Sequence, residues 1–139
     1  MAPRELDLQG SETILIVDDE PAIRGVASAI LTRYGYKVLE AANGDQARVV
    51  FNQHGQKIAL LLTDVIMPPP SGPDLAAELL GRKPALKVIY MSGFGTDPLV
   101  RDRVFGEGHE LLAKPFTIHE LVRRVRLVLD NFKTLAATT

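Results

Sequence analysis

The sequence predicts an α/β fold in which helices cover both faces of a parallel β-sheet. Short apolar runs alternate along the chain with segments of helical period, an order typical of a doubly wound parallel sheet. Three runs are strongly apolar, as expected for strands buried on both faces, and they lie at residues 13–17, 58–63 and 86–91. Residues 36–40 and 110–113 are weaker strand candidates. We therefore expect five strands, each followed by a helix.

Helical period marks several of the segments between these strands. Apolar residues recur at spacings of three and four between Ile23 and Tyr34, and again between Leu121 and Phe132. Thr117 with Glu120 has the spacing of a capping box, which predicts the start of the last helix. Other helix starts are predicted at Asn43 with Gln46, at Pro73 with Asp74, and at Thr96 followed by Asp97 and Pro98. Three arginines of the last helix are expected on a solvated face: Arg123, Arg124 and Arg126.

Length and composition indicate one globular domain. The chain has 139 residues, and compact domains most often hold about 100–150. Hydrophobic residues make up 46% of it, which is enough to build a core. We expect the domain at residues 13–130, a polar lead-in or linker at residues 1–12, and a short tail at residues 131–139.

Charge, cysteine content and the length of the apolar runs exclude several classes of protein. A formal net charge of −1 gives no field that would favour nucleic acid or a membrane surface. The chain has no cysteine, which excludes disulfides and thiolate metal sites. Its apolar runs are far shorter than the roughly 20 residues of a membrane span. We expect a cytoplasmic protein that binds neither membrane nor nucleic acid directly.

Polar side chains follow four of the predicted strands at the point where each strand ends. Asp18 and Asp19 follow the first strand, and Asp64, Ser92 and Lys114 end the third, fourth and fifth. In an open parallel sheet, ligands bind at the carboxyl ends of the strands. An acidic pair alone is more often a turn and helix cap than a metal site. The joint pattern favours one shared site.

The residue types at this edge predict phosphoryl chemistry. Three converging carboxylates, from Asp18, Asp19 and Asp64, would repel one another unless a cation neutralised them. Mg²⁺ suits a few carboxylates together with water and phosphate oxygens. Lys114 offers a positive charge to an anionic group, and the hydroxyl of Ser92 can donate a hydrogen bond to a phosphoryl oxygen. A carboxylate nucleophile, a metal and a lysine are the parts needed to form an aspartyl phosphate.

The motifs at these positions resemble one known family. The acidic pair at 18–19, DVIMPPPSG at 64–72, MSG at 91–93 and KPF at 114–116 are similar to the receiver domains of two-component signalling. The likeness covers residues 13 to about 130 and implies a flavodoxin-like fold with strand order 2-1-3-4-5 and five helices. It implies a signalling phosphoacceptor rather than an enzyme.

The resemblance also implies roles for individual residues. Asp64 would be the phosphoacceptor, and Asp18 and Asp19 would join it in holding Mg²⁺, with the backbone carbonyl of Ile66 completing the protein's share of the metal ligands. Ile66, two residues after the acceptor, and Phe94, two residues after Ser92, would flank the approach of hydrolytic water. Their apolar side chains would keep that water out and prolong the phosphorylated state.

The remaining implied roles concern the switch. Ser92 would be the switch hydroxyl, Lys114 the lysine that binds phosphate, and the Lys114–Pro115 peptide bond would be cis. Many relatives carry an aromatic residue three positions before the lysine, where this chain has Leu111. The aromatic half of the usual switch is therefore in question in this chain.

Partners and context follow from the same resemblance. The expected phosphodonor is a sensor histidine kinase or a histidine phosphotransfer protein, and a weak homodimer on phosphorylation is a further expectation. The segment VIYMSGF, with KPF and the basic last helix, is similar to receivers attached to hybrid sensor histidine kinases. An excised terminal receiver and a free-standing regulator both remain open.

Three alternative functions fit the sequence less well. A flavin or nucleotide site needs phosphate-binding backbone donors after the first strand, but Asp18, Asp19 and Glu20 would repel a phosphate there. A metal-dependent phosphatase working through an aspartyl phosphate would place its nucleophile on the first strand, with a second Asp two residues later. Here Asp18 and Asp19 are adjacent, and the best nucleophile candidate, Asp64, ends the third strand. A phosphorylation-independent interaction module is disfavoured because all five polar side chains are present, and a phosphate-analogue titration would decide it.

Overall fold

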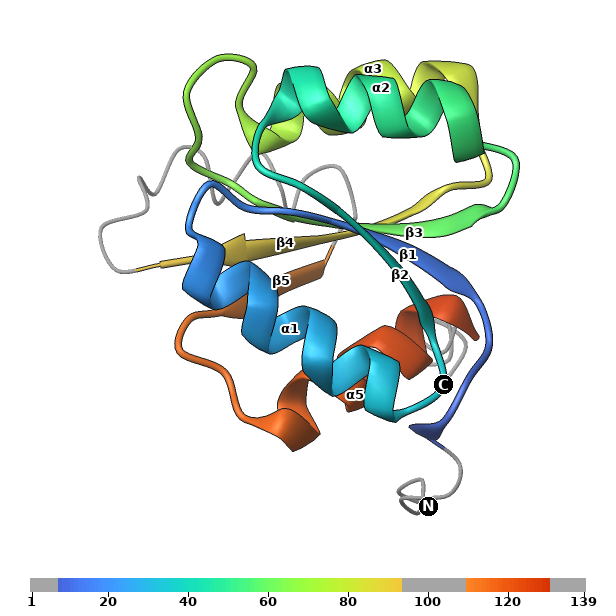
Figure 1. The fold of residues 1–139 in the computed structure, drawn as a ribbon, viewed down its shortest axis with the longest axis vertical. Coiled ribbons are helices and arrows are strands. Elements are labelled where there is room, and N and C mark those ends of the chain that lie inside the picture. Colours follow the sequence, from blue (N-terminus) through green and yellow to red (C-terminus); the bar gives the residue numbers. More distant parts are fainter. Residues whose placement is uncertain (1–7, 94–109, 131–139) are drawn as a thin grey trace, which may run out of the picture.

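The structure is a computed structural model that describes residues 8–93 and 110–130. Five parallel strands form one sheet in the order β2-β1-β3-β4-β5, which confirms the predicted fold class and strand order (Figure 1). The strands are β1 (Thr13–Val17), β2 (Lys37–Ala41), β3 (Ile58–Asp64), β4 (Lys87–Ser92) and β5 (Glu110–Ala113).

Helices cover both faces of this sheet. They are α1 (Pro21–Arg33), α2 (Gly44–His54), α3 (Gly72–Arg82) and α5 (Ile118–Leu129). Helices α2 and α3 lie on one face, and α1 and α5 lie on the other (Figure 1). The fifth expected helix, with its start at Thr96, falls outside the described residues. None of the described helices has the length and apolar character that a membrane crossing requires.

The strands differ from the predicted ranges by at most one residue at an end. β3 extends to Asp64 because this residue still pairs with Met91 of β4. β4 extends to Ser92 because it pairs with Ala113 of β5. Both functional candidates therefore sit on the last paired residue of a central strand, where the sheet holds the backbone.

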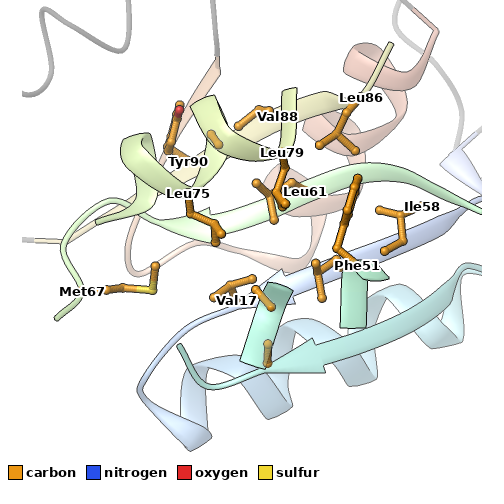
Figure 2. Packing of buried hydrophobic residues seen from close by; sticks show 14 of the residues in the cluster. Val17, Phe51, Ile58, Leu61, Met67, Leu75, Leu79, Leu86, Val88 and Tyr90 are labelled. Carbon is orange, nitrogen blue, oxygen red and sulfur yellow. The ribbon is translucent and has the colours of Figure 1, made fainter. Parts of the chain in front are cut away.

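The alternation of side chains along the strands divides the core into two clusters. Leu15 and Val17 of β1 belong to the cluster under α2 and α3. Figure 2 shows Val17 in this cluster with Phe51 and Leu79. The intervening β1 residues Ile14 and Ile16 belong to the cluster under α1 and α5. A strand with both faces buried explains why β1 reads as a continuous apolar run.

Caps define the starts of three helices. The Asn43 side chain accepts from the backbone N–H of Gln46 at 2.9 Å, as the sequence predicts. The capping box of Thr117 and Glu120 is formed in both directions. The prediction for α3 placed Pro73 and Asp74 in the first turn, where they lie, and Ser71 caps that turn by accepting from the Asp74 N–H.

Residues 8–12, which precede β1, pack against the domain. Leu8 is 1% exposed and lies in the core cluster under α1 and α5. The Tyr36 hydroxyl donates to the Leu8 carbonyl at 3.2 Å. Arg126 of α5 binds Glu12 at 2.6 Å, and the side chain of this arginine is only 12% exposed. The expectation of a solvated Arg126 is therefore wrong, because the preceding chain supplies an acidic partner that covers it, whereas Arg123 is exposed as predicted.

Candidate functional site

The polar side chains predicted to share a site are brought to one edge of the sheet. Asp18 follows β1, Asp64 ends β3, Ser92 ends β4, and Lys114 follows β5. These strands run parallel, and β1, β3, β4 and β5 are neighbours in that order. Their carboxyl ends therefore lie side by side, with α1 and α3 beginning just beyond them.

Three carboxylates form an acidic cluster at this edge. Asp18, Asp19 and Asp64 each offer an oxygen atom, and these atoms all lie within 4.8 Å of one another. Asp18 is fully buried and Asp64 nearly so, whereas Asp19 is exposed. Three convergent carboxylates, one of them open to solvent, fit a hard divalent cation such as Mg²⁺, which takes oxygen ligands and keeps several waters.

Lys114 is the cation of this cluster in the structure. Its Nζ lies 3.2 Å from Asp64 Oδ2 and 3.3 Å from Asp18 Oδ2, and its side chain is 10% exposed. Burial opposes the charge on the ammonium, but the carboxylates of Asp64 and Asp18 outweigh that effect and raise the pKa of Lys114. The lysine thus stays charged and holds two strand ends together through ion pairs.

The surroundings of Asp64 shift the pKa of its carboxyl group upward. Burial raises its pKa; the ion pair with Lys114 acts in the opposite direction, and the neighbouring charges of Asp18 and Asp19 add to the rise. A carboxylate that is costly to ionise gains when a further cation arrives beside it. The electrostatics of Asp64 therefore favour binding of a metal ion.

An open pocket extends from this cluster. Its walls come from the loop after β1, the first turn of α1, the end of β3 and the loop that follows, the residue after β4, and the β5–α5 turn. The lining residues are Asp19, Glu20, Ile23, Asp64, Ile66, Gly93, Lys114 and Pro115. Ile66 is 56% exposed at its rim. The Lys114–Pro115 peptide bond is cis, as expected, and so is the bond between Pro69 and Pro70.

Ser92 lies beside this pocket on the last residue of β4. Its backbone carbonyl accepts from the Lys114 N–H at 2.8 Å, which ties the two strand ends together. Ser92 is 9% exposed, and its neighbour Gly93 lines the pocket. Phe94, the second residue expected beside the water path, lies outside the described residues.

The turn from β3 into α3 depends on a close backbone approach. A Cβ on Gly72 would collide with the carbonyl oxygen of Asp64 and lie 3.0 Å from Val65 Cα. The Gly72 N–H donates to the Val65 carbonyl at 3.0 Å. A glycine at this position therefore lets α3 begin directly against the end of the strand that carries Asp64.

Arg24 also contacts the site, although no motif in the sequence points to it. Its Nη1 donates to the backbone carbonyl of Asp18 at 2.6 Å. A hydrogen bond to a backbone oxygen does not depend on the type of residue that carries the oxygen, so a sequence motif does not reveal it. The only available signal is that Arg24 lies about one helical turn after the acidic pair.

Comparison with known proteins places the chain in a family. The family model described as the response regulator receiver domain matches residues 14–126. This chain belongs to the response regulator receiver family. As a receiver domain it is a signalling module of two-component systems, and the fold, the strand order and the acidic edge of the sheet agree with that membership.

Similar proteins include receivers in different contexts. The receiver is 36% identical over 125 residues to the sensor kinase CckA of Brucella abortus (strain 2308), covering 90% of this chain and 13% of that protein. It is 35% identical over 121 residues to the probable transcriptional regulator ycf27 of Porphyra purpurea, covering 85% of this chain and 47% of the regulator. The chain thus spans less than half of each of these relatives.

Solved structures agree with the fold. The receiver domain of the hybrid histidine kinase CckA is 35% identical, with a TM-score of 0.70 over 84% of this chain and 98% of that one. A response regulator receiver domain protein from Clostridium thermocellum is 29% identical, with a TM-score of 0.78 over 89% of this chain and 98% of that one.

Proposed function

We propose that this receiver domain accepts a phosphoryl group on Asp64 in a reaction that depends on Mg²⁺. The observation that carries the proposal is the position of Asp64, which lies 3.2 Å from Lys114 and within the acidic cluster formed with Asp18 and Asp19. A nucleophilic carboxylate, an oxygen-lined cation site and a fixed ammonium are the parts that phosphoryl transfer to an aspartate requires.

The metal would be held by three carboxylates and one backbone carbonyl. Asp18, Asp19 and Asp64 would supply carboxylate oxygens, and the backbone carbonyl of Ile66 would complete the protein's contribution. Bound Mg²⁺ would supply positive charge to the phosphoryl oxygens, whose negative charge must be stabilised during transfer. The exposed side of the cluster at Asp19 leaves room for the water ligands that Mg²⁺ keeps.

The transfer step would conserve atoms and charge in a simple exchange. A carboxylate oxygen of Asp64 attacks the phosphorus of a phosphohistidine on the donor, and the new O–P bond forms as the N–P bond breaks. The donor imidazole leaves with the electron pair of the broken bond and takes up a proton. The donor would be a sensor histidine kinase or a histidine phosphotransfer protein, consistent with two-component membership.

Lys114 and Ser92 would then respond to the new group. The ammonium of Lys114 is paired with Asp64 before transfer and would shift to a phosphoryl oxygen afterwards. The Ser92 hydroxyl would donate to another phosphoryl oxygen and draw the chain after β4 toward the site, a local contact that biases a two-state element. Leu111 stands at the usual aromatic switch position and pairs in register with Tyr90, so Ser92 would carry most of the switch.

The wider organisation is part of the proposal. A receiver unit at residues 13–130 would be preceded by a lead-in and followed by a tail at residues 131–139. Similarity to a sensor kinase is consistent with a receiver excised from a hybrid kinase, where it would be the terminal domain. The alternative is a regulator that stands free of the kinase. A weak homodimer would form on phosphorylation.

Intact-mass measurement after incubation with a small phosphodonor tests the proposal. Wild-type protein with acetyl phosphate and Mg²⁺ should gain one phosphoryl group, and chelation of the metal should prevent the gain. Asp64→Asn should remain unlabelled, whereas Asp45→Asn, a change of an exposed carboxylate in α2, should label normally. Labelling of Asp64→Asn at the wild-type level would overturn the assignment. No labelling of wild type, with no response to a beryllofluoride titration, would favour the phosphorylation-independent interaction module.

A further inference from the structure

Every polar group of Asp18 forms a hydrogen bond within the protein. Its N–H donates to the Ala41 carbonyl at 3.2 Å, and its own carbonyl accepts from Arg24 at 2.6 Å. Its Oδ1 accepts from the Glu20 N–H at 2.9 Å, and its Oδ2 accepts from Lys114 at 3.3 Å. The residue is fully buried. One carboxylate of the acidic cluster is therefore fixed in both backbone and side chain.

Arg24 is itself held in place from two sides. Its backbone N–H donates to the Glu20 carbonyl at 3.1 Å, in the first turn of α1. Its Nε donates to Glu40 Oε1 at 3.2 Å, and the arginine side chain is 19% exposed. Glu40 lies on β2 and pairs in register with Ile16 of β1. The guanidinium of this α1 residue thus joins the acidic loop to the edge strand through two separate donors of one planar group.

We propose that Arg24 is a positioning residue for the metal site, which it serves by fixing the backbone of Asp18. The inference rests on the proposed function, because it assigns Arg24 to the Mg²⁺ site described there. A metal site whose loop must become ordered on binding has a lower affinity for the ion, because ordering costs conformational entropy. Ligands that surrounding hydrogen bonds hold in place beforehand avoid that cost. Arg24 would therefore increase Mg²⁺ affinity without touching the ion.

The positive charge of Arg24 has the opposite effect on Mg²⁺ affinity, so the two possible roles of Arg24 can be told apart. A cation beside an acidic cluster repels a second cation, so loss of the charge alone would tighten Mg²⁺ binding. Glu40 partly offsets this charge through its ion pair with Arg24. Positioning predicts weaker Mg²⁺ binding when Arg24 is neutralised, whereas simple charge repulsion predicts tighter binding. The sign of the change distinguishes the two.

The proposal is tested by titrating the full chain with Mg²⁺ alone and monitoring the binding by calorimetry and amide NMR. Arg24→Gln should raise the Mg²⁺ dissociation constant about tenfold, the scale of one charge-assisted hydrogen bond. Arg24→Lys keeps the charge but lacks the fork that reaches both partners, so an intermediate loss is expected. The control Arg48→Gln removes an arginine that bridges α2 and α3 through Glu78, and should leave the Mg²⁺ affinity unchanged.

A second readout separates positioning from general destabilisation. The Glu20 N–H reports directly on Asp18 Oδ1, so its hydrogen exchange should accelerate in Arg24→Gln and stay unchanged in Arg48→Gln. If Arg24→Gln does not fold, Arg24→Lys and Glu40→Gln carry the same test, with smaller losses of Mg²⁺ affinity expected in both.

The outcomes separate this inference from the proposed function. The role of Arg24 would be overturned if folded Arg24 variants bound Mg²⁺ as tightly as wild type, or more tightly. The proposed function would then stay intact. A wild-type protein that does not bind Mg²⁺ at millimolar concentrations would overturn the proposed function and this inference with it.

Discussion

Lys114 Nζ lies 3.2 Å from Asp64 Oδ2, so the ammonium that follows β5 is paired with the carboxylate that ends β3. The same Nζ also reaches Asp18, which follows β1. In this arrangement the lysine occupies the position of a counter-ion for two buried carboxylates. Anything that binds these carboxylates must share them with Lys114 or displace it.

Replacement of Lys114 by Gln should destabilise the metal-free protein and tighten its binding of Mg²⁺. Removing one partner of a mostly buried ion pair leaves the other charge uncompensated, at a cost on the order of 3 kcal/mol. Urea denaturation with and without Mg²⁺ measures both effects, and the stabilisation by Mg²⁺ should be larger in Lys114→Gln than in wild type. Equal stability of the two proteins without metal would contradict the role of Lys114 as counter-ion.

The raised pKa of Asp64 predicts how stability depends on pH. In the folded, metal-free protein this pKa lies above the ordinary value of 3.8, so the folded state holds the proton more tightly than the unfolded state does. Stability should therefore fall as pH rises from about 4 through the raised pKa. Asp64→Asn lacks this loss, so it should be the more stable protein at neutral pH.

Thermal unfolding across that pH range, with chelator present, checks the sign. The difference between Asp64→Asn and wild type should grow with pH and level off above the raised pKa. A difference that shrinks as pH rises would mean that Lys114 lowers the pKa of Asp64 more strongly than burial raises it.

Ile66 should lengthen the life of the phosphorylated state. Its side chain is 56% exposed at the pocket rim and offers no hydrogen bond to hold a water molecule near Asp64. Ile66→Asn supplies donors and an acceptor, and should speed loss of phosphate about tenfold, equivalent to ~1.4 kcal/mol off the barrier. Decay after donor removal in excess Mg²⁺ gives the rate. Val49→Asn, an equally exposed apolar position on α2, is the control; equal decay in all three proteins would disprove the role of Ile66.

Two glycines of α3 should respond oppositely to alanine. In Gly72→Ala the new Cβ meets the backbone of Asp64, so the end of the strand must shift. This shift should lower the free energy of unfolding by about 2 kcal/mol. Gly81 has no atom within 4 Å of the added Cβ, and Gly81→Ala should stabilise the helix by about 0.5–1 kcal/mol. Denaturation midpoints compare the two. A neutral Gly72→Ala that still accepts phosphate normally would show that the close approach is dispensable.

The fold and much of the site were predictable because the deciding signals are local. Strands buried on both faces produce short apolar runs, and a parallel sheet then brings the residues that end them to one edge. The proximity of Asp64, Ser92 and Lys114 could be predicted from their place at the ends of strands, without any knowledge of distances. The caps at Asn43 and Thr117 depend on side chains only three residues from the backbone groups that they bind.

The rest depends on contacts that no local pattern contains. Arg126 binds Glu12, which lies 114 residues earlier in the chain, so helix period alone placed this arginine in solvent. Arg24 binds a backbone carbonyl, which has the same chemistry whatever residue carries it. The burial of Leu8 follows from the same docking of the chain before β1, and a segment of mixed polarity gave no sign of it.

Identification of the phosphorylated residue tests the central claim most directly. Borohydride reduction of the acyl phosphate converts a modified aspartate to homoserine, and peptide mass spectrometry then locates the change. After incubation with acetyl phosphate and Mg²⁺, reduction should appear at Asp64 alone and should disappear when Mg²⁺ is chelated. Reduction at Asp18, Asp19 or Glu20 in place of Asp64 would contradict the proposed phosphoacceptor.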